Sequence, residues 1–362
     1  MKTLLVAGAS GLVGYAALRH VSTLPGWNVI GLSRRRPDGL DGVEMIPVDL
    51  TDRVTAAAAM ARLPHVTHVL YAALFEKPGL IAGWREPDQM RTNLAMLRNL
   101  FEPLQKVAKG LVHVTLLQGT KAYGSHITPP PVPARERWPR HDHENFYWLQ
   151  EDYLEAEQAG QSWATTIFRP QVIFGESLGS HMNMIPALGV YAALLKAANE
   201  PLYFPGGAQR VFQAVDADLL ARGCAWAAEA PNARNQAFNI NNGEAIEWRT
   251  VWPAIADAFG MAPGPDRPLS LAVEMPKREA EWGAIVRHHG LVAPVSLKAF
   301  VGESFHYADR NFNLGVSAQQ PPTLVSTIKL RQAGFQDCVD TDEMFRRLIA
   351  KCQARRWLPP RG

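Results

Sequence analysis

The 362-residue sequence lacks three features that would each narrow its function. It has only three cysteines (Cys224, Cys338 and Cys352) and no C-x-x-C spacing, so we expect reduced thiols and a cytoplasmic location rather than a disulfide framework. Its formal net charge of +3 gives no reason to expect nucleic acid or an acidic membrane surface as a partner. Its longest apolar segment, residues 184–198, contains Lys196 and is too short to span a bilayer. With 47% hydrophobic and 20% charged residues, the composition is that of a soluble globular protein.

The N-terminal stretch TLLVAGASGLVG, residues 3–14, predicts a dinucleotide-binding turn between an apolar strand and a helix. The first glycine permits the tight turn, the second lets a phosphate approach the backbone, and the third lets the helix pack closely on the strand. Free N–H groups and the positive dipole end of the helix favour a pyrophosphate there. The cofactor-binding residues predicted in this turn are Gly8, Ser10, Gly11, Leu12, Val13 and Gly14. Because G-x-x-G-x-x-G also occurs in ordinary strand–helix turns, the prediction depends on its position between strand and helix.

Apolar segments further along predict an α/β fold with a doubly wound parallel sheet of the Rossmann type. After the first strand, strands are expected at residues 27–32, 44–48, 68–73, 111–117 and 164–168, with helices between them. Strands that alternate with helices form a parallel sheet, which binds its ligands at the carboxyl ends of the strands.

The alternation becomes irregular beyond residue 176, which predicts a smaller, mostly helical substrate-binding lobe. A helix near residues 218–227 and a strand at 236–240 indicate that the chain returns once to the sheet. The predicted units are a Rossmann domain at 1–176 with a return segment at 212–243, and a substrate lobe at 177–211 and 244–362.

The end of the second predicted strand indicates which cofactor is bound. NAD-binding folds place an acidic residue about twenty positions past the glycines, where it binds the ribose hydroxyls, whereas arginine suits a 2′-phosphate. Here Ser33, Arg34 and Arg35 follow the strand, and no Asp or Glu occupies residues 31–36. A solvated basic loop is the alternative reading. We predict that the cofactor is NADP(H).

Further cofactor contacts are expected where later strands end. Asp49 could reach the adenine edge, or it could cap the helix that begins near Val54. The other residues predicted to bind the cofactor are Leu50, Ala72, Gln118, Pro170, Val172 and Ile173.

None of the eight tyrosines has a lysine four residues later, so the Y-x-x-x-K pair of most short-chain dehydrogenases is missing. A tyrosine and a lysine from separate segments could replace it. Lys121 follows the fifth predicted strand and Tyr147 begins the next long helix, so both should face the nicotinamide end of the crevice. A neighbouring ammonium would favour the phenolate of the tyrosine. Alternatively, Tyr147 is an ordinary half-buried residue and Lys121 a surface charge.

Five segments resemble motifs of the progesterone 5β-reductase/iridoid synthase-like family of atypical short-chain dehydrogenases, in a bacterial-type member. They are LQGTKAYG (117–124), NFYWLQED (145–152), FRPQVIFG (168–175), VYAA (190–193) and AFNINNG (237–243) followed by Trp248 and Trp252. The resemblance runs in order from Gly8 to beyond Gly290.

The resemblance implies an NADPH-dependent enone reductase, which delivers a hydride to the β-carbon of a C=C bond conjugated to a carbonyl. It places the catalytic pair on Lys121 and Tyr147 and the 2′-phosphate site on Arg34 and Arg35. The tyrosine would bind the carbonyl oxygen and the lysine would orient the ribose. The backbone of Ile173 would meet the carboxamide of the nicotinamide.

The sequence also departs from this family. The segment between the two predicted catalytic residues is shorter than in plant members, and residues 125–130 lack the aromatic residues that line the plant steroid pocket, which argues against steroid or monoterpenoid substrates. Residues 177–203 should pack over the nicotinamide. Candidate substrate-lining residues are His126, Met182, Met184 and Tyr191, with a loop histidine and ordinary core as the alternatives. The run at 141–144 is read as a charged loop, and no metal is expected.

Two other functions stay open. The same scaffold could reduce a ketone or modify a nucleotide sugar, although both reactions usually depend on the missing Y-x-x-x-K relay. A protein that binds NADP(H) as a sensor without turnover is a third possibility. The expected partner is a small-molecule enone, and the expected assembly is a monomer or a homodimer.

Overall fold

The computed structural model describes residues 1–362 and is built around one seven-stranded sheet. Its strands are β1 (Lys2–Ala7), β2 (Trp27–Ser33), β3 (Glu44–Pro47), β4 (His68–Tyr71), β5 (His113–Leu117), β6 (Ala164–Pro170) and β10 (Gln236–Ile240). Their order is β10-β6-β5-β4-β1-β2-β3 and every pair is parallel. The predicted doubly wound sheet is confirmed. The chain leaves β1 toward one edge and later returns to β4 on the other side, which opens a crevice between these two strands.

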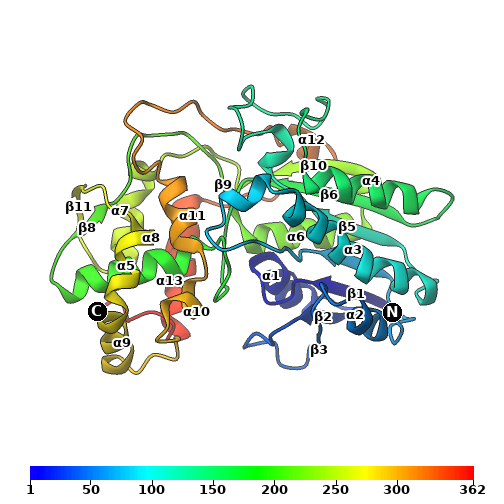
Figure 1. Cartoon of the computed structure of the whole chain (residues 1–362), viewed down its shortest axis with the longest axis horizontal. Helices are drawn as coiled ribbons and strands as arrows, with labels where there is room; N and C mark the ends of the chain where they lie inside the picture. Colours follow the sequence, from blue (N-terminus) through cyan, green and yellow to red (C-terminus); the bar gives the residue numbers. More distant parts are fainter.

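Helices cover both faces of the sheet (Figure 1). One face is covered by α1 (Leu12–Val21), α6 (Ala217–Glu229) and the short α12 (Ile328–Gln332). The other is covered by α2 (Arg53–Met60), α3 (Pro87–Val107) and α4 (Phe146–Gln158). The inner strands β1, β4 and β6 are almost entirely buried, because helices on both sides exclude water from them, whereas edge strand β3 is partly exposed.

A second lobe, rich in helices, has its own core of 43 buried residues between Val172 and Leu358. Its helices are α5 (Met184–Ala197), α7 (Trp248–Ala258), α8 (Leu271–Glu274), α9 (Glu279–His288), α10 (Leu297–Val301), α11 (Ser304–Asn311) and α13 (Thr341–Ala354). Two small parallel sheets complete it, β7 (Val172–Phe174) with β9 (Ala214–Asp216) and β8 (Leu202–Phe204) with β11 (Pro263–Asp266). None of the helices combines the length and the apolar composition that crossing a bilayer requires.

The C-terminal part of the chain does not stay in the second lobe. Leu330 and Phe335 are buried in the core under the sheet, and α12 packs on β10. The chain then crosses back, so that α13 packs against α7 and α5 (Figure 1). The residues after 244 therefore contribute to both units.

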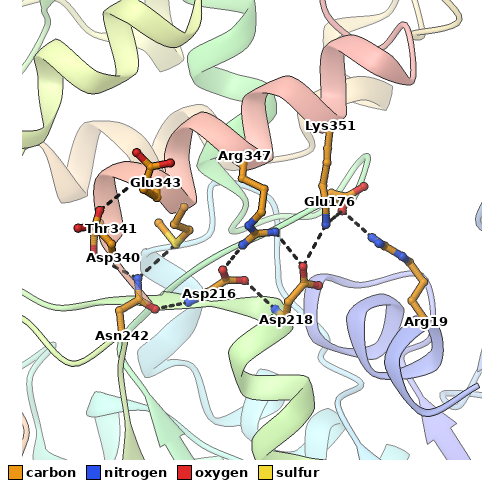
Figure 2. Close-up of polar contacts among 11 residues, drawn as sticks. Arg19, Glu176, Asp216, Asp218, Asn242, Asp340, Thr341, Glu343, Arg347 and Lys351 are labelled. Atoms are coloured by element: carbon orange, nitrogen blue, oxygen red, sulfur yellow. Dashed lines mark hydrogen bonds and ion pairs between the residues drawn. The ribbon is translucent and has the colours of Figure 1, made fainter. Parts of the chain in front are cut away.

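Charged side chains join α13 to the Rossmann side of the molecule (Figure 2). The side chain of Glu176 is only 3% exposed and forms ion pairs with Arg19 of α1 at 2.5 Å and with Lys351 and Arg355 at 2.9 Å. In a second set of ion pairs, Arg347 contacts Asp216, which is the N-cap of α6, and Asp218 in the first turn of that helix. Because Glu176 is buried, its charge depends on these cations, and the contacts connect α13 to α1.

Candidate active site

A cleft of about 380 Å³ lies between the carboxyl ends of the sheet strands and the second lobe. Residues from both units line it. All the predicted cofactor-binding residues except Gly14 are among the lining residues: Gly8, Ser10, Gly11, Leu12, Val13, Ser33, Arg34, Arg35, Asp49, Leu50, Ala72, Gln118, Lys121, Tyr147, Pro170, Val172 and Ile173.

The glycine turn forms the cradle at one wall of the cleft. Gly8 has φ +81°, and a β-carbon there would lie 2.6 Å from the carbonyl oxygen of Ala72. A β-carbon on Gly14 would lie 2.3 Å from the carbonyl oxygen of Gly8, so Gly14 sits behind the turn, where it lets the helix approach the strand. The N–H groups of Leu12 and Val13 at the start of α1 have no acceptor in the protein. These free donors and the absence of side chains fit the pyrophosphate of a dinucleotide.

Arg34 and Arg35 line the cleft beyond β2 and form neither an ion pair nor a side-chain hydrogen bond. A β-carbon on Gly179 of the second lobe would lie 3.0 Å from Nη1 of Arg35. The next arginine differs, since Arg36 donates to the carbonyl oxygen of Leu40 at 3.2 Å and does not line the cleft. Two of the three consecutive arginines therefore remain free to meet an anion.

Asp49 does not cap the following helix. That role belongs to Asp52, whose Oδ1 accepts from the N–H groups of Val54 at 2.9 Å and Thr55 at 3.3 Å. Asp49 instead accepts from the N–H and hydroxyl of Thr51, and these bonds, with a smaller effect from Arg34, lower the pKa of its carboxyl. Asp49 thus lines the cleft instead of capping α2, and its contact with the adenine edge stays a prediction.

Asn145 holds the two predicted catalytic residues in relation to each other. Lys121 lies in the short 3₁₀ helix η2 (Thr120–Tyr123) after β5, and Tyr147 lies in the first turn of α4. The side chain of Asn145 caps α4 by accepting from the N–H of Tyr147 at 3.1 Å, and it donates to the carbonyl oxygen of Lys121 at 3.2 Å. One amide thus connects two segments that are remote in sequence.

Tyr147 and Lys121 lie close together without a hydrogen bond between their side chains. The Lys121 Nζ atom is 5.8 Å from the centre of the Tyr147 ring and 4.2 Å from that of Trp84. Burial raises the pKa of Tyr147, and the charge of Glu76 raises it further. Burial is the main cause of this shift, whereas the expected effect of the Lys121 ammonium on the phenolate stays a prediction. Tyr147 is a neutral hydroxyl and can act as a hydrogen-bond donor.

Lys121 has one acidic neighbour. Burial lowers the pKa of its ammonium, and the carboxyl of Glu76 acts in the opposite direction. Glu76 is 7% exposed, accepts from the side chain of Gln89 at 2.7 Å, and has a pKa raised by burial. The sequence did not predict that Glu76 and Trp84 lie next to Lys121. Both come from the connection between β4 and α3, Glu76 from an irregular stretch and Trp84 from the short 3₁₀ helix η1 (Ala82–Arg85).

Further cleft residues were missed by the sequence analysis, among them Arg210, Tyr307 and Arg310. They come from the second lobe, where no motif or strand end marked them. His126, which was predicted, lies near them. Burial and the surrounding cations, Lys121 first, lower the pKa of His126 to about 3, so its ring is neutral at physiological pH.

The other predicted substrate-lining residues divide into two groups. Met182 lines the cleft together with residues 179–181, beside Arg35. Met184 and Tyr191 do not line it: both are fully buried in the core of the second lobe. They belong to α5, which is apolar on all sides, and such a helix occupies a core rather than one wall of a pocket.

Tyr123, His141 and His143 lie outside the cleft lining. The hydroxyl of Tyr123, a possible substitute for Tyr147, donates to Asn239 at 2.7 Å and does not line the cleft. In the loop before α4, the Nδ1 atoms of His141 and His143 lie 3.0 Å apart, but no group of three or more metal-ligating side chains forms in the structure.

Comparison with known proteins agrees with this architecture. The model of the NAD dependent epimerase/dehydratase family matches residues 4–241. Among solved structures, an enzyme of Bordetella bronchiseptica in complex with NAD+ has a TM-score of 0.66 at 15% identity, covering 98% of this chain and 99% of that one. UDP-glucose 4-epimerase of Thermus thermophilus in complex with NAD has a TM-score of 0.65 at 20% identity, with 96% and 98% covered. These structures share the fold, and the chain belongs to the NAD-dependent epimerase/dehydratase family of extended short-chain dehydrogenases.

Curated relatives place it more narrowly. The chain is 32% identical over 378 residues to (S)-8-oxocitronellyl enol synthase of Antirrhinum majus, covering 98% of this chain and 92% of that protein. It is 34% identical over 306 residues to 3-oxo-Delta(4,5)-steroid 5-beta-reductase of Arabidopsis thaliana, covering 79% and 77%. The chain is thus a member of the progesterone 5β-reductase/iridoid synthase-like family, as its motifs predicted, and these relatives support an oxidoreductase role.

Proposed function

We propose that the protein is an NADPH-dependent reductase of C=C bonds conjugated to a carbonyl. The observation that carries this proposal is the placement of Tyr147 and Lys121 in one cleft, linked by Asn145. A ketone reductase or a nucleotide-sugar enzyme would ordinarily use a Y-x-x-x-K helix, which this chain lacks.

The cleft residues fit NADPH. Gly8 and Gly11 leave room for the pyrophosphate, and the free N–H groups of Leu12 and Val13 would bind it. Guanidinium groups without partners would bind a 2′-phosphate, which gives NADPH an advantage over NADH. When bound, the nicotinamide supplies the hydride.

The side chains of the protein would act on the carbonyl of the substrate. The Tyr147 hydroxyl, kept neutral by burial, would donate a hydrogen bond to the carbonyl oxygen. That bond would strengthen as the hydride adds to the β-carbon and enolate charge develops on the oxygen, so it would favour the transition state over the bound substrate. The Lys121 ammonium would add positive charge nearby and orient the ribose. The walls of the second lobe would exclude water from the reacting atoms.

The decisive experiment measures loss of NADPH absorbance on addition of a small neutral enone, with a saturated ketone and a no-substrate sample as comparisons. Product analysis should show a saturated ketone from the enone. Reduction of the ketone instead would support the ketone-reductase alternative, and tight NADPH binding without any turnover would support a sensor.

A further inference from the structure

The cleft carries more positive charge around Lys121 than the proposed reaction needs. Arg210 and Arg310 of the second lobe line the same cleft as Lys121. The guanidinium carbon of Arg310 is 5.2 Å from the centre of the Trp84 ring, and the Lys121 ammonium lies 4.2 Å from the same ring. Arg310 and the proposed catalytic lysine therefore contact one indole.

Neither arginine has an acidic partner. No ion pair or side-chain hydrogen bond involves Arg210 or Arg310, and the Nε atom of Arg210 is buried without an acceptor. The one buried carboxyl nearby, Glu76, lies against Lys121 instead. Burial lowers the pKa of both guanidinium groups, and the charge of Arg310 lowers that of Arg210 further.

Several half-buried or buried arginines elsewhere in the protein have acidic partners. Arg169 pairs with Glu151, and Arg347 pairs with Asp216 and Asp218. Two sets of cleft arginines have none: Arg34 with Arg35, and Arg210 with Arg310. The first set suits the phosphate of the cofactor. In the second set, Arg310 lies near Lys121 and His126, at the end that the substrate would occupy.

Resting on the proposed function, we infer that the substrate is an anionic enone, whose carboxylate is bound by Arg210 and Arg310 while its carbonyl meets Tyr147. Two planar guanidinium forks match the oxygens of a carboxylate and supply charge-assisted hydrogen bonds. Arg310 is exposed toward the cleft and can meet the anion as it enters, whereas half-buried Arg210 would hold it deeper. A neutral steroid or terpenoid would leave both cations unpaired against an apolar molecule, at a cost in binding.

The test compares a straight-chain enone that ends in a carboxylate, three methylene groups from the carbonyl, with its methyl ester. We expect the native protein to reduce the acid with a kcat/KM about 10- to 100-fold above that of the ester, the effect of one or two charge-assisted hydrogen bonds. Arg310→Gln and Arg210→Gln should bring the acid-to-ester ratio of kcat/KM close to one, mainly by raising KM for the acid. Arg62→Gln, at an exposed position outside the cleft, is the matched control.

A binding measurement separates this inference from the proposed activity. Calorimetry with the saturated oxo acid and the NADP+-loaded protein should show binding that weakens about 10-fold or more in Arg310→Gln but not in Arg62→Gln. If neither enone is reduced, the proposed function fails, and the calorimetry still decides whether the arginine pair binds a carboxylate. Equal kcat/KM for acid and ester in the native protein, or equal binding by the two variants, would overturn the inference.

Discussion

Gly119 lies against the hydroxyl of Tyr147. A β-carbon on Gly119 would lie 3.2 Å from that oxygen and 3.3 Å from the carbonyl oxygen of Pro170. The backbone of Gly119 is extended, with φ −177°, so any residue could adopt its conformation. The absence of a side chain is thus required by the neighbouring hydroxyl rather than by the backbone.

Gly119→Ala should therefore disturb the reaction without unfolding the protein. The added methyl group pushes the Tyr147 hydroxyl by a few tenths of an ångström, and we expect kcat to fall about 10-fold because catalysis depends on alignment. Steady-state kinetics with an enone and circular dichroism of the fold would check this. Gly110→Ala is the control, since a β-carbon there has its nearest neighbour at 4.0 Å. Equal kcat in both variants would remove Gly119 from the site.

Tyr147→Phe should depress kcat by about 10²–10³, the usual effect of removing one oxyanion-stabilising donor. NADPH binding and the fold should change little, because only a hydroxyl is lost. Tyr123→Phe serves as the control, since that hydroxyl is bound to Asn239 outside the cleft. A Tyr147→Phe protein with nearly native turnover would make this residue a packing residue.

Replacing Arg34 and Arg35 together by alanine should remove most of the preference for NADPH over NADH. Each guanidinium group loses its charge-assisted bonds to the 2′-phosphate, while contacts to the rest of the cofactor stay. Fluorescence titration with both cofactors measures the two dissociation constants. Arg36→Ala should keep the preference, because its side chain binds the backbone of its own loop. Equal affinities for NADPH and NADH in the native protein would contradict the prediction.

The ion pairs of Glu176 should make stability depend on pH. Burial alone would raise the pKa of Glu176, but Lys351 and Arg19 hold it below its ordinary value of 4.5. The charged form is thus favoured in the folded state, and its contribution is complete above pH 4.5 and lost as the pH falls through the lowered pKa. Glu176→Gln should reduce the free energy of unfolding by about 3 kcal/mol at neutral pH, because buried cations lose their partner.

Urea unfolding at a series of pH values tests this, with Glu343→Gln as the control on α13, where the side chain is 74% exposed. The difference between native protein and Glu176→Gln should narrow as the pH falls below 4.5. Burial raises the pKa of neighbouring Asp216, which has the opposite effect on pH dependence, so the two proteins are compared with each other at each pH. A constant difference at all pH values would show that the charge of Glu176 is not what stabilises the fold.

The sequence by itself determined the sheet and the cofactor end of the cleft. Hydrophobic periodicity and the positions of glycines are local properties of the sequence. They predict the strand, the turn at Gly8 and the following helix, and Arg34 and Arg35 come directly after their strand. The pairing of Lys121 with Tyr147 was also within reach, because the carboxyl ends of neighbouring parallel strands meet at one edge.

Only the tertiary structure decided which residues lie at the substrate end of the cleft. The apolar run of α5 could equally have lined a pocket, and only packing placed Met184 and Tyr191 inside a core. Arg210 and Arg310 are a hundred residues apart and carry no motif, so their shared lack of an acidic partner exists only in the folded chain. Burial likewise raises the pKa of Tyr147, and only the folded chain brings Glu76 close enough to raise it further. Desolvation and long-range pairing depend on which segments meet, and the sequence pattern does not encode those contacts locally.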